Sequence, residues 1–135
     1  MIRVCAGILR RQGRVLICQR GGEDPFAGKW EFPGGKLAGG ESAPAALVRE
    51  LAEELGITVD AQDLRLLETS TYHYPQGPSV ELYFFEVLDF QGEPRNLVFR
   101  DMLWVSAGRA ADYDFLEGDR GLLARLAKEA LPAQG

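Results

Sequence analysis

Residues 34–57 read GGKLAGGESAPAALVRELAEELGI and combine a glycine-rich loop with the end signals of a helix. Serine is favoured as a helix N-cap, proline is tolerated in a first turn, and glycine often ends a helix, which suits Ser42, Pro44 and Gly56. We therefore predict a helix over about Ser42–Leu55. Any fold of this chain must bury one side of that helix and accommodate the glutamates that it carries.

The glutamates of this helix share one face. An α-helix advances about 100 degrees per residue, so Glu50, Glu53 and Glu54 lie within roughly 100 degrees of one another. Like charges at these spacings destabilise an exposed helix by about 0.2–0.5 kcal/mol per pair. Arg49 can neutralise one carboxylate, which leaves a divalent metal ion as the natural partner for the rest. The apolar side chains form an arc centred roughly 130 degrees away that we expect to pack on a sheet, separate from the acidic face: Leu47, Val48, Leu51, Ala52 and Leu55.

The diglycine ahead of the helix supports a metal and phosphate site. Mg²⁺ takes six hard oxygen ligands and retains several waters, so clustered carboxylates and a backbone carbonyl suit it. Gly34 and Gly35 let the main chain approach a metal ion and a phosphate, because no side chain intervenes. Taken separately, glycines mark a turn and acids form a solvated helix face. Their occurrence together favours the site.

Short apolar and β-branched runs lie on both sides of the helix. Each predicts a strand, at residues 2–9, 14–19, 30–32, 64–74, 80–90 and 103–105. The first two are joined by a turn at Gln12–Gly13. A second helix is expected over about Asp119–Leu131, with an apolar side formed by Leu122, Leu123, Leu126 and Leu131. This order predicts an α/β (α+β) fold in which a mixed β-sheet lies between α-helices.

Composition and charge restrict the class of partner. The chain has 135 residues, of which 46% are hydrophobic and 26% charged, as in a single folded domain. Its net charge of −5 argues against a nucleic-acid polymer or a membrane as partner, because both are anionic. Cys5 and Cys18 lie in apolar runs without metal-ligand spacing, so we expect buried thiols. The N-terminus lacks the pattern of a signal peptide, and the expected location is the cytoplasm.

The order of the conspicuous residues resembles a family signature. Gly35, five residues, Glu41, seven residues, Arg49-Glu50-Leu51, one residue, Glu53-Glu54, one residue and Gly56-Ile57 match the Nudix box, GX5EX7REUXEEXGU with U apolar, at every specified position. The chain is therefore identified as a member of the Nudix hydrolases. The resemblance implies that residues 1–135 form one Nudix hydrolase domain. It also implies hydrolysis of a nucleoside diphosphate linked to another group, with Mg²⁺ or, in its place, Mn²⁺.

The resemblance assigns roles within the box. Glu50 and Glu54 would be the principal metal ligands, joined by the carbonyl of Gly34. Glu53 would be a further ligand or would organise water. Metal ions held in this way neutralise the pyrophosphate and lower the pKa of the attacking water. The groups that orient the glutamates would be Glu41 and Arg49.

Outside the box the chain is most similar to the MutT-type branch. KWEFPGGK, residues 29–36, matches the segment that lines the nucleotide site, with Phe32 stacking on a base, and Arg20 matches an arginine that approaches the nucleotide. The resemblance implies that four residues of this segment bind the substrate: Phe32, Pro33, Gly34 and Gly35. The implied enzyme is a nucleoside triphosphate diphosphatase that releases pyrophosphate from oxidised purine nucleotides such as 8-oxo-dGTP and so cleanses the nucleotide pool. We expect it to be a monomer or a weak homodimer.

Two positions depart from that branch. Asp119 stands where 8-oxoguanine-specific members have an asparagine, and an ionised aspartate accepts hydrogen bonds but cannot donate them. This leaves open a pyrophosphohydrolase for CTP, dCTP or 5-methyl-dCTP, or a plain helix cap at Asp119. Val98 replaces a glutamate that serves as an extra ligand or base. Glu93 or Asp101 could take that role, or the box carboxylates could do all the work. Val98 also motivates a hypothesis from another class, a Nudix-like sensor that binds a nucleotide without cleaving it.

The remaining aromatic side chains and the one histidine are given structural roles. His73 is expected to be structural. Most of the aromatic residues in the later strand-like runs are expected to pack in the sheet rather than to stack on a base: Tyr72, Tyr74, Tyr83, Phe84 and Phe85.

Overall fold

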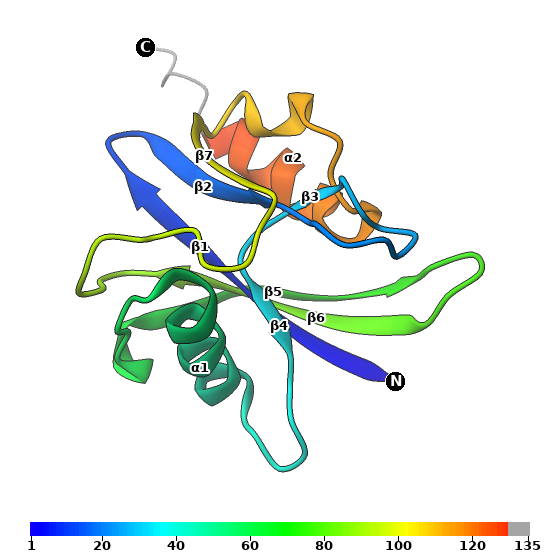
Figure 1. Ribbon diagram of the computed structural model, residues 1–135, viewed down its shortest axis with the longest axis horizontal. Coiled ribbons are helices and arrows are strands. Elements are labelled where there is room, and N and C mark those ends of the chain that lie inside the picture. Colours follow the sequence, from blue (N-terminus) through cyan, green and yellow to red (C-terminus); the bar gives the residue numbers. More distant parts are fainter. Residues whose placement is uncertain (130–135) are drawn as a thin grey trace.

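The computed structural model describes residues 1–129, which are built around one mixed sheet (Figure 1). The central strand β1 (Ile2–Arg11) runs parallel to β6 (Ser79–Val87), and β6 pairs antiparallel with β5 (Leu64–His73) at one edge. The other side of β1 is shared by two antiparallel strands, β4 (Gly34–Lys36) and β2 (Arg14–Gln19). Two further strands pair with β2: β3 (Trp30–Glu31) and β7 (Asp101–Ser106).

Helices cover both faces of this sheet. In Figure 1, α1 (Ala43–Leu55) lies below the strands and α2 (Arg120–Glu129) above them. Leu9 of β1 packs in the core with α1, whereas its neighbour Ile8 packs in the core with α2. Successive side chains of a strand point to opposite faces, so β1 anchors both cores. The expected α+β fold, with a mixed sheet between helices, is confirmed.

The ends of α1 agree with the sequence signals. The Ser42 side chain accepts a hydrogen bond from the amide of Ala45 at 3.2 Å, and Pro44 lies in the first turn. Gly56 follows the last helical residue with φ of 69°, a left-handed conformation that strongly favours glycine. The predicted extent of this helix is confirmed.

The buried side of α1 is rotated relative to our prediction. Ala52, which we placed on the apolar arc, is exposed, whereas Ala43 and Ala46 are buried. On a helix of about 100 degrees per residue, this shift brings the directions of Glu50 and Glu54 into the covered side. The prediction of a separate acidic face is therefore wrong for these two glutamates, because β4 packs against that side of the helix.

The turn predicted at Gln12–Gly13 is confirmed. Both residues have positive φ, 52° and 78°, as in the two-residue turns that suit β-hairpins. The sequence did not predict β4. It also began the last helix one residue early, because Asp119 belongs to a 3-10 turn, η3 (Glu117–Asp119). The predicted end of that helix, Leu131, lies outside the described residues.

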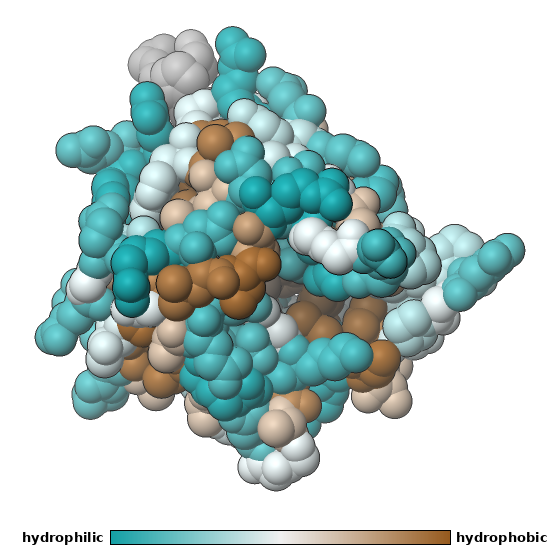
Figure 2. All heavy atoms as spheres, viewed as in Figure 1, coloured by the Kyte–Doolittle hydropathy of each residue, from teal (hydrophilic) through white to brown (hydrophobic). Residues whose placement is uncertain are grey.

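The connections also contain two 3-10 turns, η1 (Ala61–Asp63) and η2 (Ala110–Asp112). Cys5 and Cys18 are free buried thiols, as expected. Within residues 1–129 there is no helix with the length and apolar character needed to cross a bilayer. Figure 2 shows a largely hydrophilic surface with a hollow on this face, and hydrophobic residues lie in its floor.

Candidate active site

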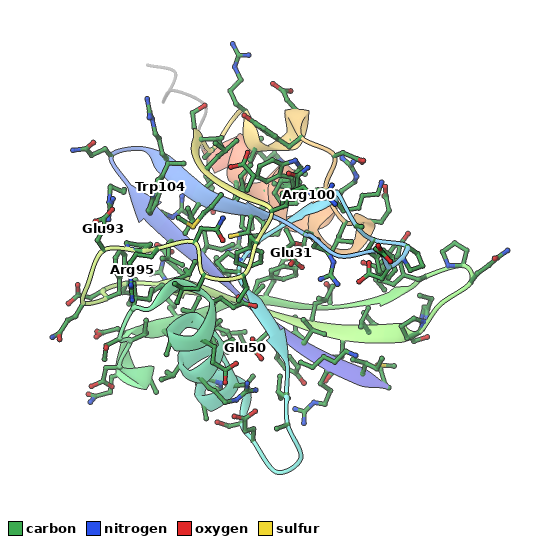
Figure 3. All side chains as sticks on the ribbon, viewed as in Figure 1. Glu31, Glu50, Glu93, Arg95, Arg100 and Trp104 are labelled. Carbon is green, nitrogen blue, oxygen red and sulfur yellow. The ribbon has the colours of Figure 1, made fainter. Side chains whose placement is uncertain are left out.

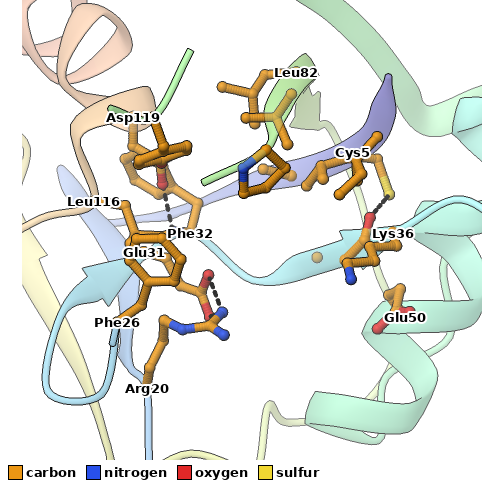
Figure 4. Close-up of a pocket in the computed structure, with 18 of the residues that line it drawn as sticks. Cys5, Arg20, Phe26, Glu31, Phe32, Lys36, Glu50, Leu82, Leu116 and Asp119 are labelled. Atoms are coloured by element: carbon orange, nitrogen blue, oxygen red, sulfur yellow. Dashed lines mark hydrogen bonds and ion pairs between the residues drawn. The ribbon is translucent and has the colours of Figure 1, made fainter. Parts of the chain in front are cut away.

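A cavity of about 500 Å³ joins the sheet, the loop after β2 and helix α1 (Figure 4). Arg20, Glu31 and Asp119 line one end, and Glu50 and Glu54 of α1 line the other. Such a volume is typical of small-molecule sites, which measure about 300–1,000 Å³. The cavity therefore brings residues from the first strands, the box helix and the C-terminal part of the chain into one place.

The diglycine lines the cavity beside Glu50 and Glu54 and is closely packed. A Cβ atom on Gly34 would stand 2.0 Å from the carbonyl oxygen of Cys5, and one on Gly35 would stand 2.6 Å from the carboxyl carbon of Glu50. Neither position can hold a side chain without moving β1 or the Glu50 carboxylate. The glycines thus allow β4 to lie directly against the acidic side of α1.

Two glutamates of α1 face this cavity. The Glu50 side chain is 15% exposed, and Glu54 accepts a hydrogen bond from the amide of Gly34 at 3.0 Å. Burial, followed by the charge of Glu50, raises the pKa of Glu54 to about 9. A pKa raised in this way is typical of a buried carboxylate beside a second negative charge.

These donors fit a divalent cation. Two carboxylates and a nearby backbone carbonyl supply the hard oxygen atoms that ions such as Mg²⁺ prefer. Among residues 1–129, no three or more His, Cys, Asp or Glu side chains gather closely enough to hold a metal ion by themselves. Water and substrate oxygen atoms would therefore complete the coordination, as is usual for Mg²⁺.

Arg49 holds the acidic side of α1 in place. Its guanidinium donates to Glu41 at 2.8 and 2.9 Å and to Glu50 at 2.9 Å, and it reaches the Lys36 carbonyl at 3.2 Å. Hydrogen bonds from Arg49 and from a backbone amide lower the pKa of Glu41 to about 2. Glu53 lies 3.4 Å from Arg49, is 57% exposed and does not line the cavity.

Asp119 closes the far end of the cavity. It is 5% exposed, and its carboxyl oxygen accepts a hydrogen bond from the amide of Phe32 at 3.3 Å (Figure 4). Burial, followed by the charge of Glu31, raises the pKa of Asp119 to about 8. Within the described residues the Asp119 carboxyl group is bonded to the amide of Phe32, next to β3, and not to an amide of α2. Asp119 is therefore not a cap of α2.

Arg20 pairs with two acidic side chains near the Asp119 end of the cavity. Its guanidinium donates to Glu31 at 3.1 Å and to Asp24 at 3.3 Å, while its Nε is buried without a hydrogen-bond partner. Burial raises the pKa of Glu31 despite this pairing. The sequence reading missed Glu31. A charged residue between Trp30 and Phe32, in an otherwise apolar strand, was the available signal.

Comparison with known proteins decides the family. The sequence profile of the NUDIX domain matches residues 1–126. The chain belongs to the Nudix family. It is 41% identical over 125 residues to the Mycobacterium tuberculosis protein named "Putative 8-oxo-dGTP diphosphatase 2", covering 93% of this chain and 87% of that protein.

Two further relatives extend the similarity. The CTP pyrophosphohydrolase of Escherichia coli is 37% identical, over 91% of this chain and 89% of its own length. The solution structure of the E. coli ORF135 protein shares the fold with a TM-score of 0.82 and 34% identity, over 99% of this chain and 95% of that one. The Nudix resemblance read from the sequence is confirmed.

The residues considered as substitutes for the glutamate missing at Val98 lie outside the Nudix cavity. Val98 is 58% exposed. Glu93 lies away from Glu50 (Figure 3) and makes a two-bond pair with Arg11 at 2.8 and 3.0 Å. Neither Glu93 nor Asp101 lines the cavity. Glu31 is an additional acid that lines the cavity, and its charge contributes to the raised pKa of Glu54.

Three other expected or missed residues need comment. The Phe32 ring is 2% exposed and packs against Phe115 with 5.3 Å between ring centroids, so it is a wall of the cavity rather than an open stacking surface. Pro33 is buried, does not line the cavity and accepts a hydrogen bond from Gly7 at 2.8 Å through its carbonyl. Tyr74, which we grouped with the sheet-packing aromatics, lies beyond the end of β5 and lines the cavity.

Proposed function

We propose that this Nudix protein is a metal-dependent nucleoside triphosphate diphosphatase that converts an NTP or dNTP and water into the monophosphate and pyrophosphate. The observation that supports this most is the single cavity in which Glu50 and Glu54 lie at one end and Asp119 at the other. A nucleotide has a matching arrangement: its phosphates would face the two glutamates, and its base would face Asp119. We also propose that residues 1–135 form a single Nudix hydrolase domain.

The metal end would hold Mg²⁺, with Mn²⁺ able to replace it, between Glu50, Glu54 and the carbonyl of Gly34, with Glu53 as an outer group. When bound, such an ion neutralises the pyrophosphate and lowers the pKa of a coordinated water. Arg49 keeps Glu50 in position through the bond at 2.9 Å, and Glu41 in turn fixes Arg49. Glycine at position 35 leaves the Glu50 carboxylate in place beside β4, because any side chain there would displace it.

The base end would select the nucleotide. With its pKa raised to about 8, Asp119 is protonated at pH 7 and can donate one hydrogen bond, which an ionised aspartate cannot. A protonated Asp119 therefore presents a donor and an acceptor, as the asparagine of 8-oxoguanine-reading relatives does. This supports oxidised purine nucleotides such as 8-oxo-dGTP as substrates, in agreement with the name of the M. tuberculosis relative.

A second candidate function is the same hydrolysis of nucleotides that carry a different nucleobase. If substrate binding ionises Asp119, its carboxylate would accept a hydrogen bond from the amine of cytosine. CTP, dCTP or 5-methyl-dCTP would then be preferred, and the E. coli relative is named for CTP. A non-catalytic nucleotide sensor is the alternative from another class, motivated by Val98.

The test is pyrophosphate release from 8-oxo-dGTP, dGTP, CTP, dCTP and 2-hydroxy-dATP in the presence of Mg²⁺. We expect hydrolysis to stop on chelation and Glu54→Gln to lower kcat at least roughly tenfold, because loss of groups supporting a metal site has effects of that size. Glu68→Gln, on β5 outside the cavity, is the matched control. If the wild-type protein released no pyrophosphate from any of these nucleotides, the enzyme proposal would be wrong.

We further propose that the protein works in the cytoplasm, as a monomer or weak homodimer, on free nucleotides rather than on a nucleic-acid polymer or at a membrane. The net charge of −5 supports this, since it disfavours both anionic surfaces. Size-exclusion chromatography with light scattering at several concentrations would measure the assembly state. A stable trimer or larger species would contradict that part of the proposal.

A further inference from the structure

Tyr74 lies where three parts of the cavity rim meet. Its ring makes an edge contact with Phe26, in the loop after β2, with 5.1 Å between centroids. A second edge contact, at 4.6 Å, joins it to Tyr72 of β5. Aromatic pairs in this geometry contribute about 0.5–1.5 kcal/mol beyond the burial of their area. The position of the Tyr74 ring is therefore defined from two sides.

The hydroxyl of Tyr74 reaches the turn that carries Asp119. It accepts a hydrogen bond from the amide of Gly118 at 3.3 Å. A Cβ atom on Gly118 would stand 3.0 Å from this hydroxyl and 2.9 Å from a methyl of Leu82, so the turn is packed tightly against both residues. Tyr74 thus contacts the residue immediately before Asp119 and restrains the backbone of η3.

Asp119 is consequently held from two walls of the cavity. Its carboxyl group accepts from the Phe32 amide on one wall, and its backbone is fixed through Gly118 by Tyr74 on the other. A group that reads the edge of a base must be held to within about 0.5 Å, and supporting residues supply that precision. The fold therefore gives Tyr74 a task that sheet packing alone would not require.

We propose that Tyr74 is a positioning residue for base selection, acting through the amide of Gly118 to place Asp119 against the edge of the bound nucleobase. This inference rests on the proposed function, because it takes the Asp119 end of the cavity as the base site. Tyr74 acts on which base is accepted and not on the hydrolytic step, since the Nudix glutamates lie at the opposite end of the cavity.

The first experiment removes only the hydroxyl. For Tyr74→Phe we expect the ratio of kcat/KM between 8-oxo-dGTP and dCTP to change by roughly threefold to tenfold, the effect of one lost hydrogen bond. The change should appear in KM, with kcat within about twofold. Tyr72→Phe is the matched control, because it removes the hydroxyl of the neighbouring tyrosine. Within residues 1–129 that hydroxyl makes no hydrogen bond, and Tyr72 does not line the cavity.

A double-mutant cycle tests whether the effect passes through Gly118. Gly118→Ala keeps the hydroxyl group of Tyr74 but displaces it, because the added Cβ would stand 3.0 Å from that oxygen. If both changes act through the same contact, their effects on the substrate ratio will not add. Additive effects, an unchanged ratio in Tyr74→Phe, or an equal loss for all nucleotides would each overturn the proposal.

A binding measurement separates this inference from the proposed function. The dissociation constants of 8-oxo-dGMP, dGMP and dCMP, measured by calorimetry without a hydrolytic step, should show the same change of ratio in Tyr74→Phe. If the protein hydrolysed no nucleotide but the ratio still changed, the enzyme proposal would fail and the role of Tyr74 would stand. If no monophosphate bound at all, the role of Tyr74 in base selection would be overturned, and the enzyme proposal would still be decided by pyrophosphate release.

Discussion

Replacing Asp119 by asparagine should stabilise the folded protein, and increasingly so as the pH rises. The unfolded chain ionises this carboxyl near pH 3.8, whereas the folded chain keeps the proton to about pH 8 because the group is buried. Between these values the folded state binds more protons, so stability falls as the pH increases. The cost is absent below the unfolded pKa and complete above the folded one.

The magnitude follows from that interval. Each pH unit between the two pKa values contributes about 1.4 kcal/mol, so the wild-type protein loses up to about 4 kcal/mol by pH 7. Asparagine does not titrate and can still accept the Phe32 hydrogen bond. Its buried NH₂ group costs about 1–3 kcal/mol where it finds no partner, which leaves a net gain of about 1–3 kcal/mol at neutral pH.

Urea denaturation of both proteins at pH 4.5, 6, 7, 8 and 9, without divalent cations, measures this difference. We expect the stability of Asp119→Asn relative to wild type to rise from pH 4.5 to 8 and then to level off. Asp112→Asn, at a side chain that is 66% exposed, is the control and should show no comparable trend. A difference between Asp119→Asn and wild type that did not change with pH would refute the account of a buried, protonated Asp119.

Two other measurements examine the metal end. For Gly35→Ala we expect kcat to fall roughly 100-fold with the fold retained, because its Cβ would stand 2.6 Å from the Glu50 carboxyl carbon and misplace that group; Gly39→Ala, with no atom within 4 Å of its Cβ, should match wild type. Binding of Mg²⁺ should release a proton and tighten between pH 7 and 9, because the pKa of Glu54 is raised to about 9 and its carboxylate must lose that proton to coordinate. Calorimetry in buffers of different ionisation enthalpy counts the protons, and a count of zero at pH 7.5 would contradict this assignment.

The local features of the fold were readable from the sequence because each depends on residues close together in the chain. Ser42 and Gly56 mark the ends of α1, and the Gln12–Gly13 turn joins the first two strands. Strand β4 was missed because Gly34–Lys36 has no apolar alternation. Its conformation depends on pairing with β1, about 30 residues away in sequence, which no local pattern records.

The candidate site was readable only in part for a similar reason. The spacing of Glu50 and Glu54 placed them on one helical face, but the approach of β4 that covers this face could not be inferred. Glu31 and Tyr74 reach the cavity through tertiary packing, and their neighbours in sequence are ordinary strand residues. The exposure of Ala52 follows from the same packing, which turns α1 toward β4.

The short segment from Phe32 to Gly34, which joins β3 to β4, sets the distance between the two ends of the cavity. Its Phe32 amide is bonded to Asp119, and its Gly34 amide, two residues later, is bonded to Glu54. Only Pro33, which forms a bend, separates these two residues, so covalent geometry limits the distance between the two amides. One inserted residue here would add a step of about 3.8 Å between neighbouring Cα atoms, and a nucleotide that filled one end of the cavity would no longer reach the other.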